Sequence, residues 1–298
     1  WGEDDASACT ASISSPPHVI ITFPACPVIV IIGQPRNVRY WPRFFGADSS
    51  SSCGACVVSE IAVLVLVGDV TPLAVECLSS LRKHSNCEIR LYCTVDQPSR
   101  LPCPIRPLPM DWTDRRMSER FRLATTMGIH GDTVLLLDTD MIFKADPFEV
   151  FLLDFDLCYT TRPVHNHRSP VNGGFSGWRV NERTKRLFRF LLAQIDEPTW
   201  PAYQVVRKRL CRDDRRMELD WWTHQDLLCT LHKSGAPTPC KLYNVGPEWN
   251  WCPDSGGGRT LTPQAREQFF ETCRDPDVHV IHYKELKTHV QPRDFVFQ

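Results

Sequence analysis

The sequence lacks an excess of charge of either sign. Lys and Arg total 34, Asp and Glu total 35, and the formal net charge of the 298-residue chain is -1. Proteins that wrap nucleic acid or adhere to anionic membranes carry clustered positive charge. We therefore expect no nucleic-acid partner and no electrostatic binding to a membrane surface.

Long hydrophobic runs are also missing. A helix that spans a membrane needs about 20 consecutive apolar residues. The most apolar N-terminal stretch covers only residues 19–32 and is interrupted by Pro24 and Pro27. Because proline breaks helices, we interpret this stretch as one or two strands and predict no membrane span in this chain.

The sequence has no acceptor site for N-glycosylation and only one Cys-x-x-Cys pair, Cys53 and Cys56, among its 14 cysteines. A single pair without a second pair or a nearby histidine pair does not predict a zinc site. Cys77, Cys158 and Cys229 lie in apolar runs, where cysteine packs as a small hydrophobic residue. The cysteine content leaves the compartment open between the Golgi or ER lumen, secretion and the cytoplasm.

The composition divides the chain into two parts. Residues 1–56 form an N-terminal extension that ends in a Ser/Cys-rich stretch with the composition of a linker. From residue 57 onward, apolar runs of strand length alternate with segments of helical periodicity. This alternation is typical of an α/β fold with a mostly parallel sheet and helices on both faces. We therefore predict a single domain over residues 57–298.

Ligands of open α/β sheets bind beyond the carboxyl ends of the strands, so the positions of strands and helices predict where functional residues lie. Apolar runs predict strands over 61–67, 87–95, 105–110 and 133–137, and helical spacing predicts helices over 71–84 and 118–127. The residues that directly follow these strands are the first candidates for a site.

Two carboxylates directly follow the apolar run 133–137. Asp138 and Asp140 stand two positions apart, where they can share a divalent cation that prefers oxygen ligands. The same spacing begins at Asp154, which ends a helical pattern, and at Asp275, which flanks a proline. Only Asp138 follows an apolar strand, so we predict the metal-binding carboxylates at 138 and 140.

The stretch SERFRLATTMGIHGDTVLLLDTDMIFKADPFEVF, residues 118–151, resembles the core of the GT-A fold glycosyltransferases, above all the glycogenin-like family 8 group. The resemblance implies that Asp138 and Asp140 bind Mn²⁺ (or Mg²⁺) and the diphosphate of a nucleotide-sugar donor, which we expect to be a UDP-sugar. Arg120 or Arg122 would be the basic residue that approaches the diphosphate. The resemblance also implies a GT-A (Rossmann-like) fold for the domain over 57–298.

Further along the chain, segments that resemble this family's motifs follow in the same order as in the family, beginning with a glycine pair. Asn172, Gly173 and Gly174 resemble the family's turn under the donor sugar, where glycine allows a close approach of the backbone because it has no Cβ. The segment 244–251 resembles the family's segment containing Tyr-Asn or Trp-Asn that packs near the donor, and an aromatic core strand is the other interpretation.

Residues 224–226 resemble the family's Asp-Gln-Asp segment beside the anomeric carbon, with His224 in place of the first Asp. The resemblance implies transfer with retention, in which Gln225 or Asp226 is the catalytic residue. An inverting enzyme would instead need a carboxylate base at the acceptor hydroxyl, for which Asp226 or Glu248 is available.

The stretch 278–283 alternates as a strand does and places His282 at its tip. In the family a histidine at this point completes the metal site, and a neutral imidazole beside two carboxylates suits Mn²⁺. His279 competes for this role, but its position predicts that it points to the opposite face. The Gly and Pro-Trp that follow in the family are absent, which leaves Lys284 or Lys287 as the lysine for the diphosphate.

Two other functions stay open. Asp138-Thr-Asp after an apolar strand also resembles the start of haloacid dehalogenase-type phosphohydrolases, in which the first Asp is the nucleophile, although Ile142 replaces their Thr or Val. The other is a module that binds a sugar nucleotide or a glycan without catalysis, in which His224 has disabled the transfer. The acceptor of a transferase could be a glycan, a protein or a lipid.

Overall fold

The computed structural model of the chain describes residues 58–66, 71–93, 101–107, 112–161, 170–211, 216–235, 239–252, 267, 271 and 273–282. The predicted extension over 1–56 and the candidates Lys284 and Lys287 lie outside the described residues, and they stay predictions. Among the described residues, no helix has both the length and the apolar character that crossing a bilayer requires.

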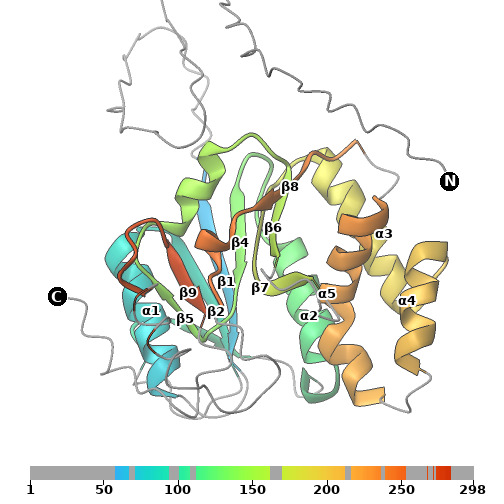
Figure 1. Cartoon of the computed structure of the whole chain (residues 1–298), viewed down its shortest axis with the longest axis horizontal. Helices are drawn as coiled ribbons and strands as arrows, with labels where there is room; N and C mark the ends of the chain where they lie inside the picture. The colour runs from blue at the N-terminus through green and yellow to red at the C-terminus, as the bar shows by residue number, and fades with distance from the viewer. Residues whose placement is uncertain are drawn as a thin grey trace, which may run out of the picture. The chain divides into compact units, whose positions relative to one another are not determined.

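A seven-stranded sheet in the order β3-β2-β1-β4-β7-β6-β8 is the centre of the described chain (Figure 1). Its strands are β1 (Glu60–Leu66), β2 (Glu88–Cys93), β3 (Ile105–Pro107), β4 (Thr133–Leu137), β6 (Leu157–Thr161), β7 (Val171–Arg179) and β8 (Leu242–Val245). Strands β3, β2, β1 and β4 pair in parallel, and so do β6 and β8. Only β7 runs antiparallel to its neighbours in this sheet.

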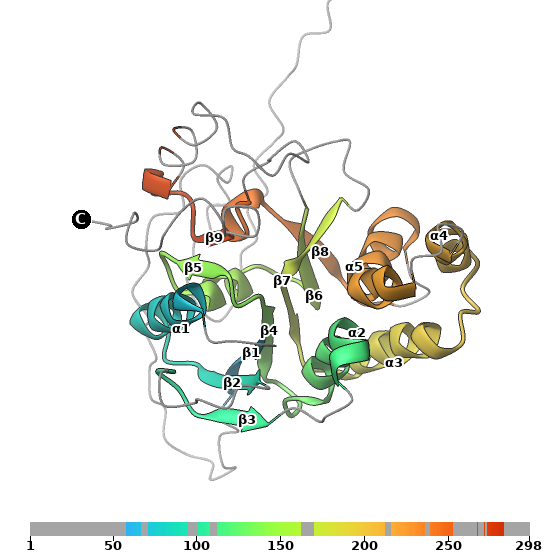
Figure 2. The same cartoon turned by 90° about the horizontal axis from the view of Figure 1, so that it is seen from below.

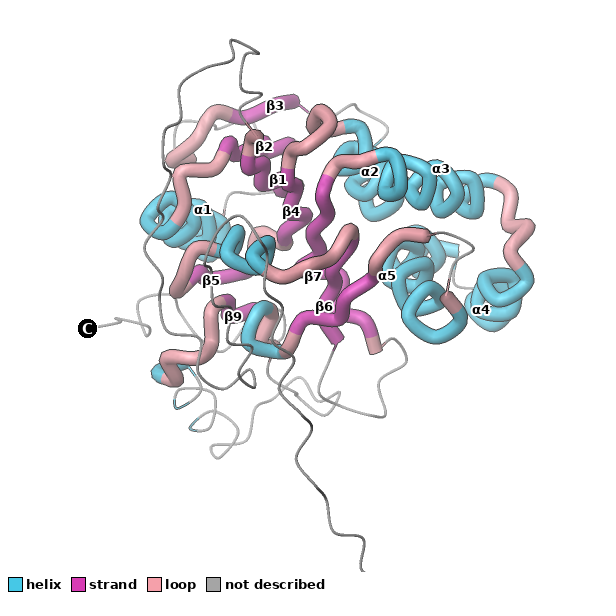
Figure 3. The backbone as a smooth tube through the Cα atoms, turned by 90° about the horizontal axis from the view of Figure 1, so that it is seen from above, coloured by secondary structure: helices cyan, strands magenta, loops and turns pink. Residues whose placement is uncertain are grey.

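Helices cover both faces of this sheet (Figures 2 and 3). One face carries α1 (Pro72–His84) and a small second sheet of β5 (Met141–Phe143) and β9 (Val280–His282). The other face carries α2 (Trp112–Thr126), α3 (Glu182–Asp196) and α5 (Arg216–Ser234), with α4 (Pro201–Cys211) packed against α5. The predicted fold class, a mostly parallel α/β sheet with helices on both faces, is confirmed.

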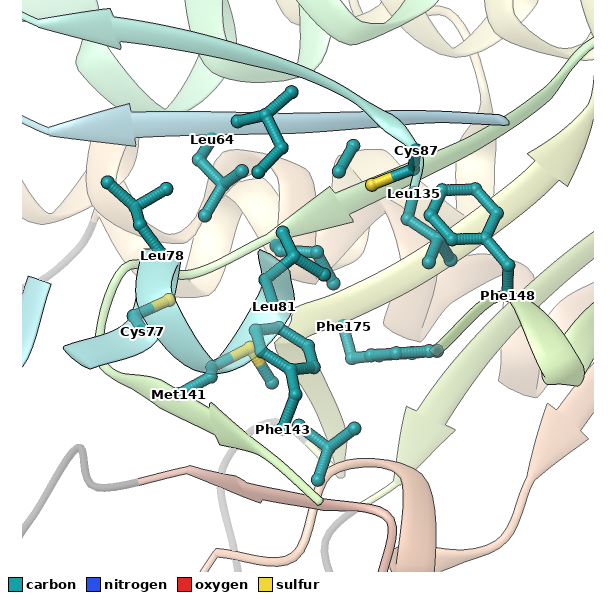
Figure 4. Packing of buried hydrophobic residues seen from close by; sticks show 14 of the residues in the cluster. Leu64, Cys77, Leu78, Leu81, Cys87, Leu135, Met141, Phe143, Phe148 and Phe175 are labelled. Carbon is teal, nitrogen blue, oxygen red and sulfur yellow. The ribbon is translucent and has the colours of Figure 1, made fainter. Parts of the chain in front are cut away.

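The side chains of β1 alternate between two hydrophobic cores. Ala62 and Leu64 pack in the core under α1, whereas Ile61 and Val63 pack in the core under α2, α3 and α5. Figure 4 shows Leu64 close to the helix α1 in the first of these cores. A strand that is buried on both faces has no polar side to expose, which explains its uninterrupted apolar sequence.

The predicted strands correspond to β1 through β4, and the predicted helices to α1 and α2, with α2 beginning six residues earlier than expected. The prediction of a turn at 172–174 is wrong, because these residues lie within β7. Asn-Gly-Gly usually marks a turn, but here the glycines occupy strand positions where neighbouring side chains leave no space for a Cβ.

Pairing between β5 and β9 brings distant parts of the chain together. The antiparallel register pairs Met141 with His282 and Phe143 with Val280. Because only three residues separate the end of β4 from the start of β5, this register holds the end of β9 beside the carboxyl end of β4. Strand β9 therefore places its last residue, His282, at the edge of the sheet where α/β proteins bind ligands.

Candidate functional site

Three side chains that the sequence separates widely meet at the carboxyl end of β4. One ligand atom each of Asp138, Asp140 and His282 lies within 4.8 Å of the others. The Nε2 of His282 lies 3.4 Å from Asp138 Oδ2 and 3.2 Å from Asp140 Oδ1. The structure thus brings together the three residues for which the sequence predicts metal binding.

The chemistry of this cluster fits a divalent cation. The Nε2 of His282 is buried and makes no hydrogen bond with either carboxylate, although both lie close to it. A buried polar atom without a hydrogen bond is costly, unless a ligand pairs with it. Two carboxylate oxygens and one imidazole nitrogen are a suitable set for Mn²⁺ or Mg²⁺, so Asp138, Asp140 and His282 could hold either ion.

Of the two candidate arginines, the structure places only Arg120 at this cluster. The Nη1 of Arg120 forms an ion pair with Asp138 Oδ1, and the residue is 4% exposed. Its Nε and Nη2 are buried and have no hydrogen-bond partner among the described residues. Arg122 is turned away, because its guanidinium lies 3.2 Å from Glu119 and 3.7 Å from Asp196.

The buried guanidinium of Arg120 therefore has a paired side and an unpaired side. The carboxylate of Asp138 compensates part of its charge, and the N–H groups of Nε and Nη2 lack an acceptor in the described part of the chain. Burying a charge without complete hydrogen bonding is unfavourable in a protein alone. An anionic or hydroxyl-bearing ligand beside Asp138 would supply the missing acceptors.

Strand β7 lies directly beside the cluster at Gly174. The backbone N–H of Asp138 donates to the carbonyl of Gly174 at 2.9 Å. A Cβ on Gly174 would lie less than 3.0 Å from side-chain atoms of both His282 and Asp138. The N–H of Gly174 donates to Asn172 Oδ1 at 3.2 Å, which holds the Asn172 amide at the same place. The absence of a side chain at 174 is therefore a requirement of the cluster.

The neighbouring residue Gly173 is held by two consecutive side chains of α5. Its N–H donates to Gln225 Oε1 at 3.1 Å, and its carbonyl lies 3.3 Å from His224 Nε2. A Cβ on Gly173 would overlap both of these side chains. His224, Gln225 and Asp226 are all buried, so α5 supports β7 from the face opposite to α1.

The other two Asp-x-Asp pairs lie away from the cluster. Asp154 is exposed and pairs with Lys241, and Asp156 accepts hydrogen bonds from Asn181, Arg183 and the backbone N–H of Lys241. Burial alone would raise the pKa of Asp156, but these donors together hold it below its usual value. The pair at 275 and 277 lies in an exposed turn.

Three contacts of the cluster have no counterpart in the sequence analysis. Asn250 Oδ1 lies 3.0 Å from His282 Nδ1, and the amide of Asn250 donates to Thr160 Oγ1 at 2.6 Å. The thiol of Cys77 lies 3.6 Å from the carbonyl of Asp138, and burial strongly raises the pKa of this thiol. Asn250 lies in the aromatic segment 244–251, but no periodicity distinguishes it there.

Comparison with known families gives one match. The family of nucleotide-diphospho-sugar transferases matches residues 113–227. The matched segment contains both arginines, Asp138, Asp140 and the residues 172–174 and 224–226, whereas His282 lies beyond it. No curated protein sequence matches the chain. Over the matched segment, the chain is therefore similar to enzymes that transfer sugars from nucleotide donors.

Solved structures of glycosyltransferases are similar to the chain at low identity. Mouse xyloside xylosyltransferase 1 in its apo form is 13% identical, with 76% of this chain and 97% of that chain covered and a TM-score of 0.44. GlyE from Streptococcus pneumoniae TIGR4 is 16% identical, with 76% and 54% covered and a TM-score of 0.45, so the chain spans about half the length of GlyE. An active-site mutant of LgtC is 14% identical, with 75% and 86% covered and a TM-score of 0.43.

Proposed function

We propose that the chain is a metal-dependent glycosyltransferase that moves a sugar from a UDP-sugar to a glycan, protein or lipid acceptor. The observation that carries the proposal is the convergence of Asp138, Asp140 and His282 on one point beside Arg120. The match of residues 113–227 to the nucleotide-diphospho-sugar transferases supports a nucleotide sugar as the donor. The low sequence identity of the solved structures leaves the donor sugar open.

The reaction requires stabilisation of negative charge. Cleavage of the bond between the anomeric carbon and the diphosphate leaves a nucleoside diphosphate on which charge develops in the transition state. A bound Mn²⁺ or Mg²⁺ supplies Lewis-acid stabilisation of this charge. Asp138 and Asp140 would hold such an ion through carboxylate oxygens, and His282 would hold it through Nε2. Arg120 adds a positive charge that is already in place, with unpaired N–H groups for the diphosphate or the sugar.

The donor sugar binds beside the segment that contains Gly173 and Gly174 in this proposal. Without side chains at these positions, His282 and Asp138 of the metal cluster and His224 and Gln225 of α5 pack directly against the backbone of β7. Gln225 reaches the same strand, since its Oε1 accepts the N–H of Gly173. We propose transfer with retention, in which Gln225 or Asp226 stabilises the positive charge that develops at the anomeric carbon.

Release of UDP tests this function without knowledge of the acceptor, because water can replace the acceptor in a slow hydrolysis of the donor. The full chain is incubated with a panel of UDP-sugars, with Mn²⁺ or with a chelator, and UDP is measured. We expect UDP from at least one donor, only in the presence of the metal. Phosphate release from a phosphomonoester without UDP release would favour the phosphohydrolase, and donor binding without turnover would favour the binding module.

A further inference from the structure

Asn250 lies behind His282, on the side of the imidazole ring that faces away from the two carboxylates. The three residues Asn250, His282 and Thr160 are at most 3% exposed. Asn250 Oδ1 lies 3.0 Å from His282 Nδ1, and Asn250 Nδ2 lies 2.6 Å from Thr160 Oγ1. These contacts form a buried chain from β6 through Asn250 to β9.

The hydroxyl of Thr160 determines the orientation of the side-chain amide of Asn250. A hydroxyl has a single hydrogen to donate, and that of Thr160 is donated to the carbonyl of Asn172 at 3.2 Å. Its contact with Asn250 must therefore be one in which it accepts from the NH₂ group of the amide. The oxygen of the amide consequently faces His282.

An acceptor that faces Nδ1 requires a hydrogen on Nδ1. The amide nitrogen of Asn172 also approaches this atom, but at 3.5 Å, which is longer than the 3.0 Å to Asn250. The shorter contact determines the tautomer, so Nδ1–H donates to Asn250 Oδ1. In neutral imidazole the other nitrogen then carries a lone pair, which agrees with the absence of any hydrogen bond from Nε2 in this structure.

The carboxylates favour the opposite tautomer. Asp140 Oδ1 and Asp138 Oδ2 lie 3.2 and 3.4 Å from His282 Nε2, so their negative charge attracts a hydrogen on Nε2. Such a hydrogen would occupy the lone pair through which His282 binds a cation. The cluster therefore needs a partner on the far side of the ring that keeps the hydrogen on Nδ1.

We propose that Asn250 is a positioning residue that holds His282 as the Nδ1–H tautomer and so keeps Nε2 available to the cation. The proposal rests on the proposed metal site but concerns a residue that does not touch the metal. Partners of this kind fix the tautomer and the ring orientation of metal-binding histidines, and their loss weakens metal binding by about 10–100-fold.

The backbone around Asn250 is well suited to this role. Asn250 directly follows the short 3-10 helix η3 (Pro247–Trp249). On one side of it, the carbonyl of Glu248 accepts the N–H of His279 at 2.9 Å. On the other side, the carbonyl of Trp251 accepts the N–H of His282 at 2.8 Å. These two backbone hydrogen bonds hold the segment around Asn250 against β9 and keep its side chain beside the imidazole of His282.

The affinity for Mn²⁺, measured by electron paramagnetic resonance of the free ion, tests the proposal without any donor or acceptor. We expect Asn250→Ala to weaken binding by about 10–100-fold relative to the wild type. Asn250→Asp keeps an oxygen in front of Nδ1 and should recover most of the loss. Asn244→Ala is the matched control, because Asn244 is exposed and its amide donates to Thr161, and this variant should bind Mn²⁺ as the wild type does.

The tautomer itself is visible in the ¹⁵N chemical shifts of His282 in the metal-free protein. We expect the Nδ1–H form in the wild type and in Asn250→Asp, and a shift toward Nε2–H in Asn250→Ala. A merely structural role of Asn250 would lower thermal stability without changing the tautomer. Thermal unfolding of each variant identifies any that fail to fold, and if Asn250→Ala does not fold, the tautomer of His282 in the wild type carries the test.

Two results would overturn the proposal: wild-type Mn²⁺ affinity in folded Asn250→Ala, or an Nε2–H tautomer of His282 in the wild type. A wild type that binds no Mn²⁺ would instead refute the proposed metal-dependent function. The tautomer measurement is made without metal, so it would still test the role of Asn250 in that case. The two failures are therefore distinguishable.

Discussion

His282 Nε2 lies 3.2 Å from Asp140 Oδ1, and the pairing of β9 with β5 sets this distance. In the register of the two strands, His282 is opposite Met141, the residue that follows Asp140. A shift of one residue would turn His282 to the other face of the small sheet. The cluster therefore depends on the register of a pair of short strands.

Arg120 and Arg122 lie on the same helix and differ in what they face. We expect Arg120→Ala to weaken binding of UDP by about tenfold or more, because it removes a buried positive charge beside Asp138. Arg122→Ala is the control and should change UDP affinity little, because Arg122 pairs with Glu119 near the surface. Isothermal titration in the presence of Mn²⁺ measures both, and equal affinities would contradict the placement.

Gly174→Ala should damage the cluster. Its Cβ would lie less than 3.0 Å from His282 and Asp138, so these side chains or β7 must move. We expect a loss of about 1–3 kcal/mol in the free energy of unfolding and weaker Mn²⁺ binding. Ser176→Ala on the same strand is the control, since its buried hydroxyl makes no hydrogen bond with any described residue. Denaturant unfolding measures the stabilities, and Mn²⁺ affinity as in the wild type for Gly174→Ala would contradict the close packing.

Asp226→Asn should separate catalysis from donor binding. If Asp226 stabilises charge in the transition state, the substitution lowers the rate of UDP release by at least about 100-fold and leaves UDP affinity within a few-fold of the wild type. The rate is measured with saturating donor. Equal losses of rate and affinity would show that Asp226 supports the fold, because it is buried in α5.

Asp156 should contribute stability that depends on pH. Its carboxylate accepts hydrogen bonds from Arg183, Asn181 and the Lys241 backbone, and its pKa in the folded protein is below the ordinary value of 3.8. This contribution is complete above the unfolded-state pKa and disappears as the pH falls through the lower folded-state pKa.

We expect Asp156→Asn to lower the free energy of unfolding by about 1–3 kcal/mol at pH 7. The difference from the wild type should shrink below about pH 4, in line with the ordinary carboxyl pKa. Asp154→Asn is the control, because Asp154 is exposed and its carboxylate pairs with Lys241 at the surface. A deficit of the same size at every pH would contradict the assignment.

The rule that ligands of α/β proteins bind beyond the carboxyl ends of the strands was sufficient to predict where Asp138 and Asp140 lie. Each strand from β1 to β4 has a continuous or alternating apolar sequence, and the ends of such strands are identifiable without long-range information. His282 could be predicted for the same reason, as the tip of an alternating strand. These positions depend on local pattern, which a single sequence contains.

The contacts of Gly173 and Asn250 could not be predicted in this way. The glycines of β7 have the composition of a turn, and only the packing of α5 and His282 against the strand explains why they are glycines. Asn250 is defined by its bonds to Thr160 and His282, which come from two distant strands. Such partners depend on tertiary packing and leave no periodic signal in the sequence.

Metal-dependent release of UDP from a UDP-sugar, compared between the wild type, Asp140→Ala and Asp154→Ala, tests the central claim most directly. Asp140 lies in the cluster with His282, whereas Asp154 is the exposed member of another Asp-x-Asp pair and contacts Lys241. We predict Mn²⁺-dependent UDP release by the wild type and Asp154→Ala, and a loss of at least about 100-fold in Asp140→Ala. Release at the wild-type rate by Asp140→Ala, or release that is unchanged by a chelator, would contradict the account.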